Sequence, residues 1–472
     1  MRSRLSAAGW LAAVALLGVP AIASAHGLVG KQDLPIPRWL FAWGAAVVLV
    51  ISFVGLAALW PQPRLEGAAE RRLLRVPRVL EVLCGAIGVA VFAISVYSGF
   101  AGIDSATANL MPTMFYVVFW VAIPFASLLF GDVFAAFNPW RAVARAAAWA
   151  FGRLRGEAPA PLAYPAWLGQ WPAAFGILAF AWLELVYSNK DDPTLLAALA
   201  LIYAAIQLVG MSLFGIRPWE SNADAFGVYF GFFGRIGPLH WARRELWLRP
   251  PLVGVAKIVP VAGTVALLCV GIGTTSFDGM SQGAIWTGQE GIAPGLQQRF
   301  LNLGFSGETA LEITFTIGLL AMVGLVTVVY RLGVLGMRSV DHSHSAARLA
   351  RVFSTSLIPI AMAYVVAHYF SLLVYQGQAL GFLISDPLGH GSNLFGTANT
   401  AIDYNVIGAN GVWYVQVVAL IIGHAAGLAL AHDRALVEYD DPRKAIRSQY
   451  WMLAVMVGFT SLGLFILSAA AQ

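Results

Sequence analysis

The chain has 472 residues, of which 59% are hydrophobic and only 11% are charged, and its mean hydropathy is +0.73. Soluble domains carry about 25% charged residues, so this composition excludes an ordinary soluble protein and predicts that most of the chain lies in a lipid bilayer. The formal net charge is +5. Because the basic residues lie in short loops, this charge indicates membrane topology and argues against nucleic acid as a partner.

The first 25 residues have the pattern of a secretory signal peptide. Arg2 and Arg4 precede an apolar run over residues 10–22, which ends in the small residues Ala23-Ser24-Ala25. This run is too short to cross a bilayer, which takes about 20 residues. We therefore predict a signal peptide over residues 1–25, cleaved after Ala25.

Apolar runs in the rest of the chain predict an all-α integral membrane protein with about ten transmembrane helices, both termini outside. The predicted spans cover residues 38–60, 80–100, 113–135, 172–188, 195–215, 252–274, 309–330, 352–377, 412–431 and 450–469. Together they form one polytopic domain, residues 26–472. The segment 224–239 is too short and too glycine-rich for a span, so it is predicted to be interfacial or re-entrant.

The distribution of Lys and Arg predicts the orientation of these spans. Twenty-two of them lie in alternate loops. The opposite side carries four, namely Lys31, Arg38, Lys190 and Arg299. The positive-inside rule places the basic loops in the cytoplasm and both termini outside, in agreement with the signal peptide. The expected location is the cytoplasmic (inner) membrane of a bacterium.

Two histidines, His368 and His424, lie inside consecutive apolar spans. At a rise of about 1.5 Å per residue, His368 lies about 14 Å and His424 about 18 Å below the outer ends of their helices. Ionisable residues inside a membrane are a functional-site hypothesis by default. The alternative is that each is a neutral histidine that packs and hydrogen-bonds to a neighbouring helix.

Further polar groups are expected in the outer half of the membrane. Glu312 lies early in the seventh span, and His390 and Asp403 lie in the outer loop between the two histidine-bearing spans. Histidines and carboxylates that face a water-filled cavity can hold a divalent metal, Zn or Cu, which lowers the pKa of a bound water. We predict His368, His424 and His390 as metal ligands, and Glu312 and Asp403 as catalytic acids. Glu312 is alternatively a helix N-terminal acid favoured by the helix dipole.

Cleavage after Ala25 makes His26 the N-terminal residue. Its free amine and its imidazole then offer two nitrogen ligands within one residue, and nitrogen ligands suit Cu(II). His26 is therefore a fourth predicted metal ligand. The alternative is that His26 is simply the residue at which cleavage occurs.

Six stretches resemble a family of bacterial polytopic membrane proteins, the fenitrothion hydrolases. They cover residues 25–53, 137–142, 224–239, 367–378, 385–389 and 423–436. This resemblance implies a phosphoric triester hydrolase that cleaves the P–O-aryl bond of an organophosphorus triester, and it assigns no catalytic residues. The mature start His-Gly is also similar to the copper-binding subunit of particulate methane and ammonia monooxygenases.

Three hypotheses of function follow. The first is a membrane-embedded, metal-dependent hydrolase that takes a small apolar substrate from the lipid or from the outer side. The second is a transporter or permease for a metal ion or small solute, which midplane polar residues also suit. The third is a redox protein that binds haem or copper, because histidines at one depth on neighbouring helices can be axial ligands. The lipid bilayer is a partner in all three, and a partner subunit or a homo-oligomer stays open.

Overall fold

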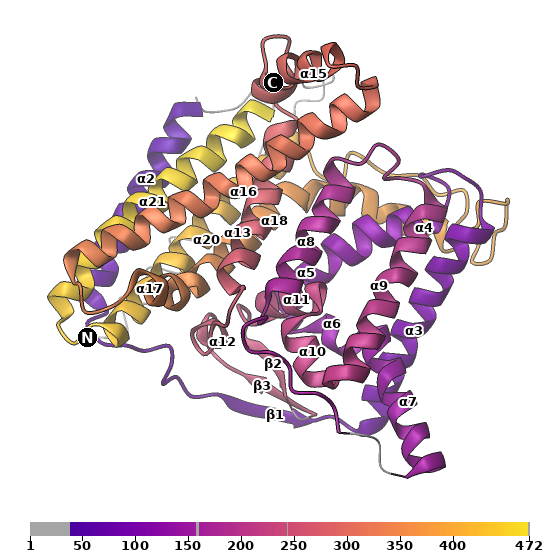
Figure 1. The fold of residues 1–472 in the computed structure, drawn as a ribbon, viewed down its shortest axis with the longest axis horizontal. Helices are drawn as coiled ribbons and strands as arrows, with labels where there is room; N and C mark the ends of the chain where they lie inside the picture. Colours follow the sequence, from indigo (N-terminus) through magenta and orange to yellow (C-terminus); the bar gives the residue numbers. More distant parts are fainter. Residues whose placement is uncertain (1–37, 157–159, 243, 471–472) are drawn as a thin grey trace. The chain divides into compact units, whose positions relative to one another are not determined.

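The protein is mainly helical in the computed structural model, which describes residues 38–156, 160–242 and 244–470 (Figure 1). In the first half lie α2 (Arg38–Leu59), β1 (Arg71–Arg75), α3 (Arg78–Ala101), α4 (Leu110–Pro112), the π-helix η1 (Thr113–Ala122), α5 (Ile123–Phe130), α6 (Val133–Phe137), α7 (Pro139–Arg155), α8 (Trp171–Leu185), α9 (Pro193–Phe214), α10 (Ile216–Asn222) and α11 (Ala225–Gly234). In the second half lie β2 (Leu239–Ala242), β3 (Glu245–Leu248), α12 (Val253–Ala256), α13 (Thr264–Ser281), α14 (Ala284–Thr287), α15 (Ile292–Asn302), α16 (Gly307–Val340), α17 (Ala346–Phe353), η2 (Ser354–Ser356), α18 (Leu357–Gln376), η3 (Gly377–Ala379), α19 (Leu380–Leu383), α20 (Ala409–Glu438) and α21 (Pro442–Ala470).

Six helical segments in the described part of the chain are long and apolar enough to cross a membrane. They are Arg78–Ala101, Leu110–Phe130, Pro193–Phe214, Gly307–Val340, Ala346–Leu383 and Ala409–Glu438. This result confirms the prediction of a helical membrane protein. Every predicted span overlaps a helix, but α8 has only 15 residues and is shorter than a span normally needs.

The predicted span 252–274 differs most from the structure. The short helix α12 ends at Ala256, and α13 begins only at Thr264. Pro260 cannot donate a helical hydrogen bond, and Gly263 adopts a left-handed φ of 83°, so the chain turns between the two helices. The apolar residues 252–263 therefore form only the short helix α12 and a turn, and not one end of a span. Because α13 starts late, it continues to Ser281 and includes Asp278.

A small antiparallel sheet in the order β1-β3-β2 was not expected from the sequence. It lies at the end of the helices opposite to α15 (Figure 1). Arg71 pairs with Leu248 in its register, and the adjacent Glu70 accepts a 2.6 Å hydrogen bond from Lys257 Nζ. Burial alone would raise the pKa of the Glu70 carboxyl, but the hydrogen bond and charge of Lys257 hold that pKa below its usual value.

The segment predicted as interfacial or re-entrant forms α11, which lies inside the protein. Almost all of its side chains are buried, including Phe226, Tyr229 and Phe230. Asp224 caps its N-terminus and also accepts hydrogen bonds from Tyr203 Oη at 2.8 Å and Trp140 Nε1 at 2.7 Å. These contacts favour the re-entrant alternative, because a short helix within a membrane protein is tolerated where protein surrounds it.

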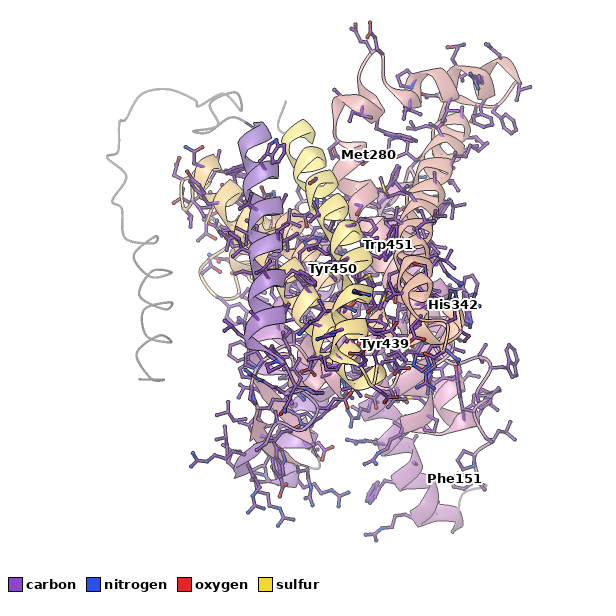
Figure 2. All side chains as sticks on the ribbon, turned by 90° about the vertical axis from the view of Figure 1, so that its left-hand side faces the viewer. Phe151, Met280, His342, Tyr439, Tyr450 and Trp451 are labelled. Carbon is purple, nitrogen blue, oxygen red and sulfur yellow. The ribbon has the colours of Figure 1, made fainter. Side chains whose placement is uncertain are left out.

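Small residues bring the second-half helices close together. The helix α21 packs on α2, α16 and α20, and Figure 2 shows its residues Tyr450 and Trp451 part of the way along the helix. Between α18 and α20, a Cβ atom added at Gly423 would lie 2.2 Å from Ala363 Cβ and 2.8 Å from the Pro359 carbonyl oxygen. The contact of α18 with α20 therefore requires glycine at this position, as in other membrane helix pairs.

We predict that Gly423→Ala lowers the stability of the purified protein by about 1–3 kcal/mol, the usual cost of overpacking. The matched control is Gly324→Ala on α16, where an added Cβ meets no atom within 4 Å. Thermal unfolding in detergent should show a lower midpoint for Gly423→Ala only. Equal midpoints for the two variants would contradict the close approach of α18 to α20.

Candidate active site: a buried histidine–aspartate pair

His368 of α18 faces Asp278 of α13. His368 Nε2 lies 2.7 Å from Asp278 Oδ2, and the two side chains are 26% and 10% exposed. A carboxylate at one ring nitrogen fixes the orientation and the tautomer of an imidazole. The ring nitrogen that points at the carboxylate carries the proton, so Nδ1 is left as the proton acceptor. Nδ1 makes no hydrogen bond with the part of the chain that the structure describes.

Tyr369, the next residue of α18, links this pair to a second carboxylate. Its hydroxyl donates a 3.0 Å hydrogen bond to Asp278 Oδ2 and lies 3.5 Å from Glu184 Oε1 of α8. A phenolic hydroxyl carries one proton, so it donates to one carboxylate at a time. The side chains of His368, Asp278, Tyr369 and Glu184 thus form a continuous polar chain across three helices, which we call the acid–base chain.

The two carboxylates of the acid–base chain lie close to the ends of their helices. Glu184 is next to the last residue of α8, and Asp278 lies in the last turn of α13. Lys190 Nζ donates a 2.9 Å hydrogen bond to the carbonyl oxygen of Glu184. Met280, which follows Asp278 closely, lies toward the end of the protein at which α15 lies and away from the sheet (Figures 1 and 2). The site therefore lies in the half of the protein that faces away from the sheet.

Aromatic side chains form a wall beside the acid–base chain. Trp120 of η1 lies edge-on to Tyr369 at 6.4 Å between ring centroids and stacks on Tyr229 of α11 at 6.0 Å. Trp120 Nε1 is close enough to the Tyr369 hydroxyl to interact with it, whereas Tyr229 Oη is buried and makes no hydrogen bond with the described residues. Trp120 also lies in a ten-residue π-helix, a type of helix that is frequent at functional sites.

His424, the predicted partner of His368, has a different environment. It is fully buried, its Nδ1 donates a 2.8 Å hydrogen bond to the Leu420 carbonyl, and its ring packs on Tyr364 at 6.1 Å. With Nδ1 protonated, Nε2 is a buried acceptor that has no partner in the described ranges. The predicted pairing of His368 with His424 is replaced by the pairing of His368 with Asp278.

The other predicted site residues lie in separate environments. Glu312 Oε1 accepts hydrogen bonds from the backbone nitrogen and the hydroxyl of Ser188, at 3.0 and 2.9 Å. Asp403 is exposed in the loop before α20 and accepts a hydrogen bond from the backbone of Asn405. His390 is an exposed residue of the same loop, and only its backbone nitrogen bonds to Asp386. His26 lies outside the described residues.

The side chains that the structure describes do not group into a metal site. Within residues 38–156, 160–242 and 244–470, no group of three His, Cys, Asp or Glu side chains is placed to hold a metal ion. A haem with two axial histidines would need His368 to face a second histidine across the iron. Its Nε2 is instead directed at the Asp278 carboxylate. The Zn or Cu ion stays a prediction.

Asp278 is the residue that the sequence analysis missed. The predicted span 252–274 ends before it, and the sequence analysis assigns it no role. Asp278 is the one acidic residue between Thr264 and Ser281. A carboxylate in an otherwise apolar run would have marked it as a candidate, had the span been placed at those residues.

No protein-family model, no curated protein and no solved structure matches the chain. The role of the site therefore rests on its own geometry.

We predict that Asp278→Asn and His368→Gln each lower stability by about 1.5–3 kcal/mol, because each removes one partner of a buried hydrogen bond to a charged group. The double variant should be about as stable as either single variant, since the second change removes a group that has already lost its partner. Thermal unfolding measures all three. In the control cycle, the losses of stability caused by His368→Gln and His390→Gln should add in the double variant. If the losses caused by His368→Gln and Asp278→Asn also add, the pairing is contradicted.

Proposed function

We propose that this protein is a membrane-embedded hydrolase in which His368, oriented by Asp278, is the general base that activates water. The observation that carries this proposal is the 2.7 Å contact from His368 Nε2 to Asp278, which leaves Nδ1 free on a ring that is one quarter exposed. A histidine held by a carboxylate through one nitrogen and accepting a proton through the other is the arrangement used by hydrolytic triads.

The proposed substrate is a neutral, apolar ester with a good leaving group, such as an aryl phosphorothioate triester. His368 Nδ1 takes a proton from water as the water oxygen forms a bond to phosphorus. The P–O-aryl bond breaks, and the aryl oxide leaves with the electron pair. The imidazolium that forms is stabilised by the Asp278 carboxylate, which keeps its hydrogen bond from Tyr369. An apolar triester can reach the site from the lipid.

The proton taken up by His368 has to leave the site before the next turnover. The acid–base chain offers a route, because Tyr369 lies between Asp278 and Glu184, and Glu184 is beside the end of α8. Proton transfer through hydrogen-bonded side chains requires such a continuous series of donors and acceptors. Tyr369 therefore has a positioning role for Asp278 and a transfer role toward Glu184 in this proposal.

A second candidate function is proton-coupled transport of a small solute. It is favoured by the two carboxylates, Asp278 and Glu184, which share one tyrosine hydroxyl within the membrane domain. The buried helix α11 also resembles the short, broken helices from which transporters build their binding sites. In this alternative the acid–base chain binds and releases a proton during each transport cycle without cleaving the solute.

We predict that His368→Gln lowers kcat for hydrolysis of an aryl phosphorothioate triester by about 10²–10⁴-fold, the usual contribution of a general base. The release of the aryl alcohol from purified full-length protein in detergent measures this rate. His424→Gln is the control: it also removes a buried histidine but should retain the rate. If both variants lose activity equally, His368 is not the general base.

Two further measurements separate the alternatives. The first is hydrolysis after treatment with chelators, with metal content measured in parallel. If His368 and Asp278 act without a metal, hydrolysis should survive this treatment. Loss of hydrolysis that Zn or Cu restores would favour the predicted metal site. Proteoliposomes that take up the intact triester or another solute with the pH gradient, with no product formed, would favour transport over hydrolysis.

We also propose ten spans with both termini outside, in the inner membrane of a bacterium. The arginines of β1 lie at the end of the protein opposite to α15, and the positive-inside rule makes this end cytoplasmic. The acid–base chain lies in the other half, which then faces outward. Reporter proteins fused after Gln472 and within residues 157–159 test this topology. An active periplasmic reporter is expected at the C-terminus and a cytoplasmic one at 157–159, and the reverse pattern would contradict it.

A further inference from the structure

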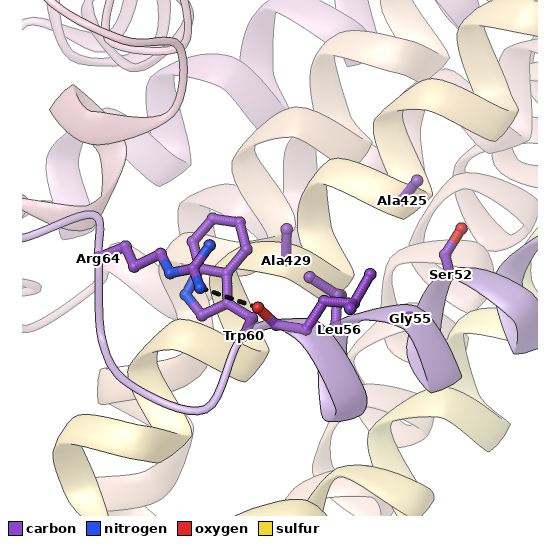
Figure 3. A pocket seen from close by; sticks show the side chains of 8 residues that line it. Ser52, Gly55, Leu56, Trp60, Arg64, Ala425 and Ala429 are labelled. Atoms are coloured by element: carbon purple, nitrogen blue, oxygen red, sulfur yellow. Dashed lines mark hydrogen bonds between the residues drawn. The ribbon is translucent and has the colours of Figure 1, made fainter. Parts of the chain in front are cut away.

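A pocket of about 320 Å³ opens between α2 and α20, and no residue of the acid–base chain lines it (Figure 3). It is lined by Ser52, Gly55, Leu56, Leu59, Trp60, Arg64, Ala425 and Ala429. Most of this surface is apolar, and four of the eight lining residues are small. The neighbouring face of α2 is apolar as well and exposed, with Val47, Ile51 and Val54 between 49% and 64% exposed. The pocket therefore continues into a surface that suits contact with lipid.

One end of the pocket is polar and positively charged. The Arg64 guanidinium lies over the Trp60 ring, 5.0 Å from its centroid, and donates a 2.8 Å hydrogen bond to the Leu59 carbonyl oxygen (Figure 3). These contacts hold the guanidinium at the point where α2 ends. Tryptophan and arginine at the end of an apolar helix are typical of the membrane–water interface.

The two nearby carboxylates are hydrogen-bonded or paired to other groups and not to this guanidinium. Asp433 accepts hydrogen bonds from Trp60 Nε1 at 3.0 Å and from the backbone nitrogens of Arg64 and Leu65. Glu66 is paired with Arg434. Among the described residues, no carboxylate forms an ion pair with the Arg64 side chain. The positive charge of Arg64 is thus available to a ligand at the mouth of an apolar pocket.

We propose that this pocket binds an anionic phospholipid. One acyl chain lies along the small-residue groove between Ser52 and Leu56 of α2 and Ala425 and Ala429 of α20, and the phosphate accepts hydrogen bonds from Arg64. A basic residue at the mouth of a pocket between membrane helices recognises anionic head groups by charge. A zwitterionic lipid meets the same groove but carries no net charge to complement Arg64. This site does not depend on the proposed hydrolase activity.

The test is native mass spectrometry of the full-length protein released from micelles that contain equal amounts of phosphatidylglycerol and phosphatidylcholine. The wild type should retain phosphatidylglycerol preferentially. Arg64→Gln should weaken its retention about fivefold, the effect of one arginine near a membrane surface. The control Arg71→Gln removes an exposed charge outside the pocket and should leave the preference unchanged.

A second pair of variants tests the apolar part of the pocket. Gly55→Leu places a side chain in the groove, and Gly44→Leu places one elsewhere on α2; at both positions an added Cβ meets no atom within 4 Å, so both proteins should fold. Lipid retention should fall for Gly55→Leu only. Equal retention of the two lipids by the wild type, or equal effects within either pair of variants, would overturn the proposal.

Discussion

The contact between His368 and Asp278 constrains the arrangement of the helices around it. A bilayer offers no water to an ionisable group, and leaving a buried carboxylate without its hydrogen-bond partner costs about 1–3 kcal/mol or more. Both side chains are mostly buried, so α13 and α18 have to keep the depth and rotation that bring the 2.7 Å contact about. Tyr369 extends the same constraint to α8 through Glu184. The site is thus both a chemical centre and the polar connection between three otherwise apolar helices.

The opposite face of α18 is fixed by packing. Gly423 lets α20 approach Ala363 and Pro359 closely. The rotation of α18 that directs His368 toward Asp278 therefore directs Ala363 and Pro359 toward α20. The two histidines have different partners: His368 is held by a carboxylate, and His424 donates to its own helix.

The sequence predicted much of the fold, and part of the site. Hydropathy located the long helices and identified His368 as a candidate, because charge and the length of an apolar run can be read directly along the sequence. It did not fix helix rotation, since α18 is apolar on every side and carries no amphipathic signal. The predicted start of the span that contains α13 was wrong because residues 257–263, which are mostly apolar, form a turn between α12 and α13, and this error hid Asp278. The sheet was missed because β1, with three arginines among five exposed residues, lacks the alternation of a half-buried strand.

The central claim is that Asp278 holds His368 with Nδ1 free to accept a proton. Nitrogen NMR of the full-length protein labelled with ¹⁵N-histidine tests it most directly, with the His368 signal assigned by its loss in His368→Gln. The account predicts that neutral His368 is protonated at Nε2 and unprotonated at Nδ1, and that Asp278→Asn alters this signal while His390→Gln does not. A neutral His368 protonated at Nδ1, or a signal that Asp278→Asn leaves unchanged, would contradict it.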